Sequence, residues 1–416
     1  MTQGWRILLG LAAGLAVGIG LAATHAPFGE DVASVAATVG GLWLDALKMT
    51  IVPLVFALVV SGVVSTASAA TAGGIAARSI GLFLVLLTAG TAISAIATPA
   101  LLAAIPAPAG SAEALRHAIT GAAAEALPPA PSAGAMLRSI IPTNPIAAAA
   151  ESAMLPLVVF ALFFGFAASR LPDARRSHID GLFMAIAEIM LIMVGWVLWA
   201  APAGAFALAL AVAARTGMAA VGAFAHYILI ISAICVLIGL CAYPLAAIGA
   251  RVPIGRFARA AAPVQGIAVS TQSSLASLPA TIAAARNQLG LPDRITGVTL
   301  PLAASLYRST SPAANLAVAI YIASIMGIAL TPATIAAGGA VAIAVSLGGV
   351  SVASQVTFVA LIAPICIAMG VPIELLALLI AVETIPDIFR TASNVTMNLA
   401  AATLVDRMTP GDRPQT

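Results

Sequence analysis

Charged residues are scarce in this chain of 416 residues. Asp, Glu, Lys and Arg together make up 8% of the residues, whereas 62% are hydrophobic. A soluble domain carries roughly a quarter charged residues, and a third of that fraction is too little to solvate its surface. The composition therefore predicts an all-α polytopic membrane protein with the lipid bilayer as its partner. It excludes soluble enzymes, secreted modules and partners such as nucleic acid.

Cysteine, histidine and aromatic residues are also few. Cys235, Cys241 and Cys366 lie in apolar runs without metal-ligand spacing, and we interpret them as small core residues. The chain has four histidines and no zinc-protease, nucleotide-loop or Ser/His/Asp pattern, so we predict no enzyme activity, no cofactor and no metal site. His226 begins an apolar stretch and is interpreted as interfacial, with a proton relay as the alternative.

Long uncharged stretches predict the membrane spans. About 20 residues are needed to cross the hydrocarbon core, and stretches of that length with few or no charged residues lie at about 7–23, 34–66, 78–99, 144–169, 180–213 and 219–249. Between the third and fourth, residues 104–139 form an extracytoplasmic loop rich in Ala and Pro. With both termini cytoplasmic, twelve arginines fall inside and three outside, which favours that orientation in an inner (plasma) membrane of bacterial type.

The last third of the chain predicts two re-entrant hairpins. Residues 255–288 carry arginines at both ends, and the polar run Ser270–Ser274 lies in the middle, so this segment enters from the inside and returns there. The stretch from Ser309 to Ile373 has 65 residues without a charge. We divide it into the rest of a seventh span (294–328) and a second hairpin from outside (333–370), followed by an eighth span (372–405). Such inverted repeats are typical of secondary transporters with a midplane site.

The eighth span carries a polar stripe at helical spacing. Its members are Glu383, Asp387, Arg390, Thr391, Asn394 and Asn398. Arg390 lies 17 residues before Arg407, about 25 Å along a helix, and a charge at that depth is a functional hypothesis by default. We predict a substrate cavity in which a guanidinium binds a carboxylate and a carboxylate binds an ammonium group. The alternative is a structural ion pair between Asp387 and Arg390.

The seventh span is predicted to be interrupted. The polar run Tyr307–Ser311 precedes Pro312, and Pro ends a helix because it lacks a backbone donor and clashes with the preceding turn. Arg308 lies 14 residues past Arg294, about 21 Å deep, at the level of the polar stripe. In the second span, Asp45 and Lys48 are interpreted as a structural pair.

Several motifs resemble one family of transporters. They are Leu47–Phe56, Ile141–Pro145, the serine-rich Ser273–Pro279 in the first hairpin, and Asp387–Thr391 with Asn394 in the last span. Together they resemble the dicarboxylate/amino acid:cation symporters, which include the glutamate transporters, over nearly the whole chain.

The resemblance implies a homotrimer of eight transmembrane helices and two re-entrant hairpins per protomer. Residues 1–73 and 140–215 (spans 1, 2, 4 and 5) would form a scaffold. Residues 74–103 (span 3) and 216–250 (span 6), with both hairpins and the last two spans, would form a transport domain that moves as an elevator.

The resemblance also assigns a binding site. Arg390 would hold a substrate carboxylate and Asp387 the amino group, with Thr391 and Asn394 completing the pocket. Further candidates for substrate binding are Ser273, Ser274 and Ser311. The retained Asp–Arg pair implies a small anionic substrate, an acidic amino acid first and a C4-dicarboxylate second.

The sodium motif of the family is altered in this chain. It would align with Tyr307–Ser311, where Ser309 replaces an Asp, and a second family Asp is Asn398. The tip of the second hairpin reads Ser351–Ser354 instead of Gly-Val-Pro-Gly. We therefore predict that Arg308 is a tethered cation in place of Na⁺. Transport would then be H⁺-coupled through Asp387 or Glu383, or uncoupled. Alternatively, Arg308 pairs with Asp387 and closes the amino-group pocket.

The predicted function is therefore secondary transport of acidic amino acids or C4-dicarboxylates. An anion-conducting channel and a non-transporting membrane receptor are the alternatives. Sustained current without substrate counterflow would indicate the channel.

Overall fold

The computed structural model describes residues 3–24, 27–71, 73–108, 110, 141–151, 153–348 and 354–409. Within these ranges the chain forms helices and no strands, which confirms the all-α prediction. Most of the predicted loop at 104–139 and the tip residues Ser351–Ala353 of the second hairpin lie outside the described residues.

The first part of the chain contains long helices and several interruptions. The elements are α1 (Gln3–Thr24), α2 (Gly29–Lys48), α3 (Ile51–Thr71), α4 (Gly74–Ala104), α7 (Pro145–Ala150), α8 (Met154–Ala168), α9 (Asp173–Trp199), α10 (Ala201–Thr216) and α11 (Ala219–Pro244), which continues into the π-helical turn η1 (Leu245–Gly249).

The second part consists of shorter helices arranged in pairs. The elements are α12 (Ile254–Thr271), α13 (Leu278–Asn287), α14 (Asp293–Leu306), α15 (Ser311–Met326), α16 (Pro332–Gly348), α17 (Ser354–Ala368), α18 (Leu376–Leu379) and α19 (Thr384–Met408). Helices α12 and α13 pack on each other, as do α16 and α17, in the two segments where hairpins are expected. Within the seventh predicted span, one helix ends at Leu306 and the next begins at Ser311, just before Pro312.

Five helical segments in the described ranges are long and apolar enough to cross a membrane. They are Arg6–Thr24, Gly29–Ala67, Gly74–Ala104, Asp173–Trp199 and Val221–Gly249. The remaining apolar helices have 10–17 residues, because breaks divide the other predicted spans.

Two of the predicted spans contain a break between helices. The second divides at Met49 and Thr50 between α2 and α3, and the fifth divides at Ala200 between α9 and α10. Pro202 near the start of α10 has no backbone donor to lose at a helix N-terminus. The indole Nε1 of Trp43 donates to the carbonyl of Val197 at 2.9 Å, near the end of α9.

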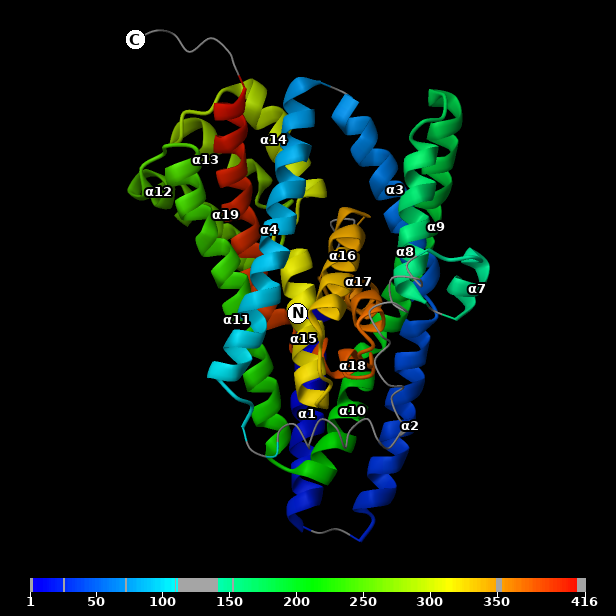
Figure 1. The fold of residues 1–416 in the computed structure, drawn as a ribbon. Coiled ribbons are helices and arrows are strands. Elements are labelled where there is room, and N and C mark those ends of the chain that lie inside the picture. Colours follow the sequence, from blue (N-terminus) through cyan, green and yellow to red (C-terminus); the bar gives the residue numbers. More distant parts are fainter. Residues whose placement is uncertain are drawn as a thin grey trace.

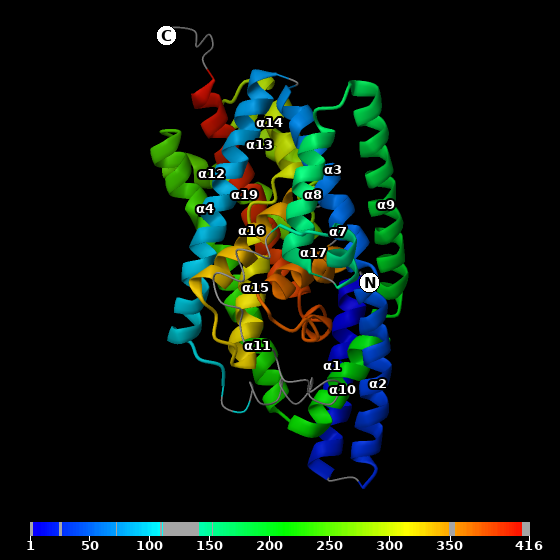
Figure 2. The same cartoon turned by 45° about the vertical axis from the view of Figure 1, so that its right-hand side comes forward.

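The helices pack in two groups that meet through α3, α16 and α17. One group joins α1 and α2 to α10, and α3 to α8 and α9, while the other joins α19 to α4, α11, α12 and α14, and α15 to α4 and α16. The two groups lie on opposite sides of the molecule (Figures 1 and 2). Helices α16 and α17 contact both α3 and α15.

Helices α1 and α10 approach closely through glycine. A Cβ atom on Gly10 or Gly14 would collide with the backbone of Pro202 or Phe206, respectively. Small residues at four-residue spacing allow such an approach between membrane helices. This contact joins the N-terminal helix firmly to the first group.

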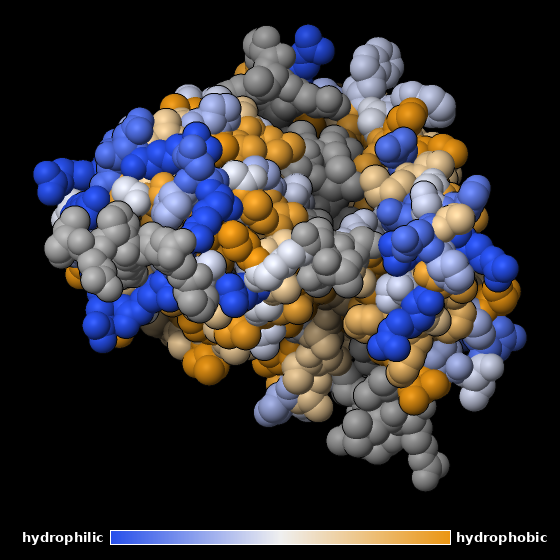
Figure 3. All heavy atoms as spheres, turned by 90° about the horizontal axis from the view of Figure 1, so that it is seen from above, coloured by the Kyte–Doolittle hydropathy of each residue, from blue (hydrophilic) through white to orange (hydrophobic). Residues whose placement is uncertain are grey.

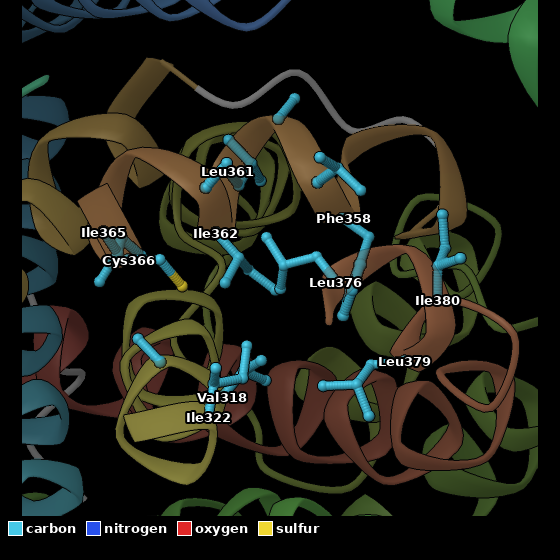
Figure 4. Close-up of a cluster of buried hydrophobic side chains, with 14 of the residues drawn as sticks. Val318, Ile322, Phe358, Leu361, Ile362, Ile365, Cys366, Leu376, Leu379 and Ile380 are labelled. Atoms are coloured by element: carbon cyan, nitrogen blue, oxygen red, sulfur yellow. The ribbon is translucent and has the colours of Figure 1, made fainter. Parts of the chain in front are cut away.

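An apolar core holds the start of α19 in place. It is made by residues of α15, α17 and α18 (Figure 4), among them Val318, Ile322, Phe358, Leu361, Ile362, Leu376 and Leu379. All are nearly inaccessible to solvent. Because α18 precedes α19 by four residues, this core fixes the point at which the polar stripe begins.

The polar ends of the helices gather at one end of the molecule. Helices α12, α13 and α14 and the C-terminal end of α19 lie together there, and the α1–α2 connection lies at the opposite end (Figure 1). Seen from that end, hydrophilic residues form broad patches (Figure 3). Helices α12–α14 and the end of α19 carry five of the arginines predicted to be cytoplasmic: Arg256, Arg259, Arg286, Arg294 and Arg407.

Candidate binding site

The polar stripe of α19 is buried inside the second group of helices. Glu383 is fully inaccessible, and Asp387, Arg390, Thr391, Asn394 and Asn398 are each at most 5% exposed. Helix α19 packs against α4, α11, α12 and α14, so the stripe faces protein. Buried polar groups at this density require hydrogen-bond or ion-pair partners within the protein.

Arg390 forms its closest ion pair with Glu383. The guanidinium Nη2 lies 2.5 Å from a Glu383 carboxylate oxygen, whereas Nη1 lies 3.9 Å from Asp387. Glu383 occupies the N-cap position of α19 without a side-chain capping bond, seven residues or two helical turns before Arg390. The Asp387–Arg390 ion pair considered from the sequence is present at 3.9 Å, and Glu383 is the nearer partner.

Helix α11 supplies two site residues that the sequence did not reveal. The hydroxyl of Tyr227 donates to Glu383 Oε2 at 2.8 Å, and the side chain of Cys235 contacts the Arg390 guanidinium. Our interpretation of Cys235 as a small core residue is right about its burial but omits this contact. Tyr227 and Cys235 are eight residues apart and share a helix face, but α11 is apolar all round, so no sequence signal identifies that face.

Asn394 closes the break between α14 and α15. Its side-chain oxygen accepts from the Thr310 backbone N–H at 3.0 Å, the Thr310 hydroxyl at 2.8 Å and the Ser309 hydroxyl at 3.1 Å. A backbone N–H freed by an interrupted helix needs such a partner where no water is available. The Asn394 oxygen, expected to face substrate, is thus engaged by the helix break.

The same break directs Arg308 toward α19. Tyr307 is buried, and its ring stacks on Phe83 of α4 with centroids 4.4 Å apart and planes 2° from parallel. Arg308, the next residue, is half-buried and interacts electrostatically with Asp387 and Arg390. Two guanidinium groups and two carboxylates therefore share one site, and their charges cancel.

The predicted serines occupy different surroundings. Ser311 is buried, and its hydroxyl accepts from Asn315 Nδ2 at 3.4 Å. Ser273 and Ser274 lie in the turn after α12, which ends at Gln272 with φ of +50°. The Ser273 hydroxyl accepts from Ala276 N at 3.2 Å. In the described part of the chain, no hydrogen bond joins Ser273 or Ser274 to α19.

Side chains that could ligate a cation are few in the described residues. These residues contain no group of three His, Cys, Asp or Glu side chains that could hold a metal ion. Hard cations take carboxylate and carbonyl oxygens as ligands, and the Asn394 oxygen already accepts from three donors. The buried Asn398 oxygen has no hydrogen-bond partner within the described ranges.

Two other predicted positions can be compared with the structure. His226 is 5% exposed, and its ring nitrogens face the Ile105 carbonyl at 2.8 Å and the Tyr321 hydroxyl at 3.3 Å. Tyr321 of α15 and Ile105, which follows α4, thus cover His226, and its placement at the membrane interface stays a prediction. Asp45 is exposed, and the side chain of Lys48 lies outside the described residues.

The chain belongs to the sodium:dicarboxylate symporter family, whose sequence profile matches residues 4–408. The protein is thus a membrane transporter and not an enzyme, and the family resemblance is confirmed.

Several relatives cover the chain almost completely. It is 28% identical to the proton/glutamate-aspartate symporter of Escherichia coli strain K12, over 96% of this chain and 91% of that protein. It is 24% identical to the proton/sodium-glutamate symport protein of Geobacillus stearothermophilus, over 97% and 93%. The L-cystine uptake protein TcyP of Shouchella clausii is 27% identical, over 97% and 88%.

Proposed function

We propose that this protein is a secondary transporter that carries an acidic amino acid across the inner membrane together with a proton. The observation that carries the proposal is the buried Arg390–Glu383 pair, 2.5 Å apart, with Asp387 beside it. A guanidinium binds a carboxylate in a planar, two-pronged geometry. The E. coli relative is named a proton/glutamate-aspartate symporter and the Geobacillus relative a proton/sodium-glutamate symport protein, and both names support the same assignment.

Exchange of carboxylates at Arg390 links substrate binding to proton binding. A substrate carboxylate that binds Arg390 displaces Glu383, whose ionised form is then buried without its cation. A fully buried carboxylate without a cation beside it is strongly disfavoured in its ionised form. Glu383 therefore takes up a proton and becomes a neutral acid. An acidic amino acid carries one net negative charge, which one proton balances.

Arg308 supports independence from sodium. Its guanidinium interacts electrostatically with Asp387 at the break where related transporters carry their sodium motif. A fixed positive charge there supplies the electrostatic role of a bound cation, and a guanidinium retains its proton. Arg308 thus acts as a tethered cation, and Tyr307, Ser309 and Asn398 are the further candidates for the coupling site.

One observation favours a second candidate substrate, a C4-dicarboxylate. If Arg308 keeps Asp387 neutralised, no carboxylate is free to bind an ammonium group. A dicarboxylate would then place one carboxylate on Arg390 and the other on Arg308. The electrostatic contact between Arg308 and Asp387 supports this version.

The elevator arrangement is part of the proposal. The group of helices around α1, α3, α9 and α10 corresponds to the scaffold, which forms a homotrimer. The group around α4, α11, α15 and α19 corresponds to the moving transport domain. Its two helix pairs, α12–α13 and α16–α17, would be the re-entrant hairpins, with both chain termini in the cytoplasm.

Counterflow in proteoliposomes tests the proposal. Labelled L-aspartate, L-glutamate and succinate are offered to vesicles loaded with the unlabelled compound, with and without Na⁺. We expect exchange of aspartate and glutamate without Na⁺. Exchange of succinate alone would support the dicarboxylate version. Exchange of none of the three, or current without counterflow, would contradict a carboxylate transporter.

A further inference from the structure

Helix α11 holds both members of the buried ion pair. The Tyr227 hydroxyl donates to Glu383 Oε2 at 2.8 Å, and the Cys235 side chain contacts Arg390. Tyr227, Cys235 and Glu383 are all fully buried. One helix thus contributes one contact to each partner of the pair on α19.

The position of α11 along α19 is fixed close to these contacts. The Ser393 hydroxyl donates to the Cys235 carbonyl at 2.8 Å. One turn further on, Gly239 lies so close to Ser393 that a Cβ atom would collide with its side chain. The Tyr227 hydroxyl therefore meets Glu383 as part of a close helix contact.

Tyr227 differs from the other groups that act on Glu383. Asp387 and Arg390 on α19 and Cys235 on α11 act on it electrostatically, and Arg308 at the helix break faces the same cluster. From α15, the Tyr321 ring packs edge-on against the Tyr227 ring at 5.3 Å, but the Tyr321 hydroxyl donates elsewhere, to the Ala223 carbonyl at 3.1 Å. Tyr227 thus contributes a neutral donor that favours the ionised carboxylate.

We propose that Tyr227 is a positioning residue: its hydroxyl holds Glu383 against Arg390 in the empty site and so sets the substrate affinity and the pH at which substrate binds. Every substrate carboxylate must replace Glu383 at Arg390, and the Tyr227 hydrogen bond makes that replacement harder. This inference rests on the proposed function only for the identity of the competing anion.

Binding of L-aspartate as a function of pH is the first test. The hydroxyl is removed in Y227F, and the matched control Y321F removes the neighbouring hydroxyl that bonds to Ala223. A hydrogen bond to a charged group corresponds to a factor of about ten or more in affinity. We expect Y227F to bind aspartate about tenfold tighter at neutral pH, with the midpoint of its pH dependence at higher pH. Y321F should match the wild type in both respects.

An infrared titration of the substrate-free protein is the second test. The carboxylic-acid band that disappears in E383Q belongs to Glu383. In Y227F this band should appear at higher pH than in the wild type, and in Y321F it should not move. In the E383Q background, Y227F should change aspartate binding no further.

These measurements separate the inference from the proposed function. If Y227F titrates like the wild type, or binds aspartate more weakly with unchanged pH dependence, Tyr227 has only a structural role and the inference is wrong. If the wild type binds neither aspartate nor succinate, the proposed function fails, and the infrared titration still decides the role of Tyr227.

Discussion

The guanidinium of Arg390 lies 2.5 Å from the Glu383 carboxylate and 3.9 Å from that of Asp387. The residue best suited to bind an anionic substrate is therefore occupied by an anion of the protein itself. Because both side chains are buried, removing one partner leaves the other uncompensated, which is costly. In our proposal, a substrate carboxylate takes the place of Glu383 at Arg390.

Replacing Glu383 by Gln should uncouple substrate binding from pH. The amide cannot take up a proton, so the affinity for aspartate should become independent of pH and a proton gradient should no longer drive its accumulation. Binding is measured on purified protein and accumulation in proteoliposomes. The matched control is E374Q, the same change at a half-buried residue before α18. Proton-driven accumulation by E383Q would show that another group carries the proton.

Removing Arg308 and restoring a carboxylate should make transport depend on sodium. The double variant R308M/S309D deletes the tethered cation and returns an Asp to the position where the family motif carries one. Aspartate uptake by this variant should rise with Na⁺, whereas uptake by the wild type should not. Uptake by S309D alone serves as the control, because its new carboxylate still has Arg308 beside it. Sodium stimulation of the wild type would contradict the role given to Arg308.

Asn394 should be important for stability as well as for binding. In N394A, the Thr310 backbone N–H and the Ser309 hydroxyl lose their acceptor, whereas the Thr310 hydroxyl retains the Arg390 carbonyl at 3.2 Å. Each buried unsatisfied group costs about 1–3 kcal/mol. The thermal unfolding midpoint in detergent should therefore fall clearly. The comparison variant N315A loses a single bond of 3.4 Å and should unfold closer to the wild type. Equal unfolding midpoints for N394A and N315A would argue that the hydrogen bonds of Asn394 do not stabilise the break between α14 and α15.

The contact between α1 and α10 should depend on glycine at Gly14. A Cβ atom there collides with the backbone of Phe206, so G14A should destabilise the protein by about 1–3 kcal/mol. Gly20 lies on the same helix with nothing within 4 Å of its Cβ position. The G20A variant should therefore be at least as stable as the wild type. If G14A is as stable as G20A, the close contact between α1 and α10 does not contribute to stability and this prediction is wrong.

Hydropathy and spacing predicted much of this architecture. The uncharged stretches identified the apolar helices, and Pro312 located the break before α15. The spacing of Glu383, Asp387 and Arg390 placed them on one face of a buried helix. These signals are local in the sequence, because a charge or a proline in an apolar run is conspicuous.

The remaining features depend on which helices pack together. Tyr227, Cys235 and His226 lie on a helix that is apolar on all sides, so no polar face indicates that the first two contact α19 and the third contacts α15. The breaks at Met49 and Ala200 lie inside longer apolar stretches, and the nearby residues Asp45, Lys48 and Pro202 do not by themselves fix a helix end. The preference of Arg390 for Glu383 over Asp387 depends on side-chain geometry, since both acids lie within two turns of it.

Accumulation of labelled L-aspartate in sodium-free proteoliposomes under an imposed inward proton gradient tests the central claim most directly. We predict that the wild type concentrates aspartate above the external level while the gradient lasts, and that E383Q does not. Accumulation that requires Na⁺, or that is the same with and without the proton gradient, would contradict proton coupling through Glu383.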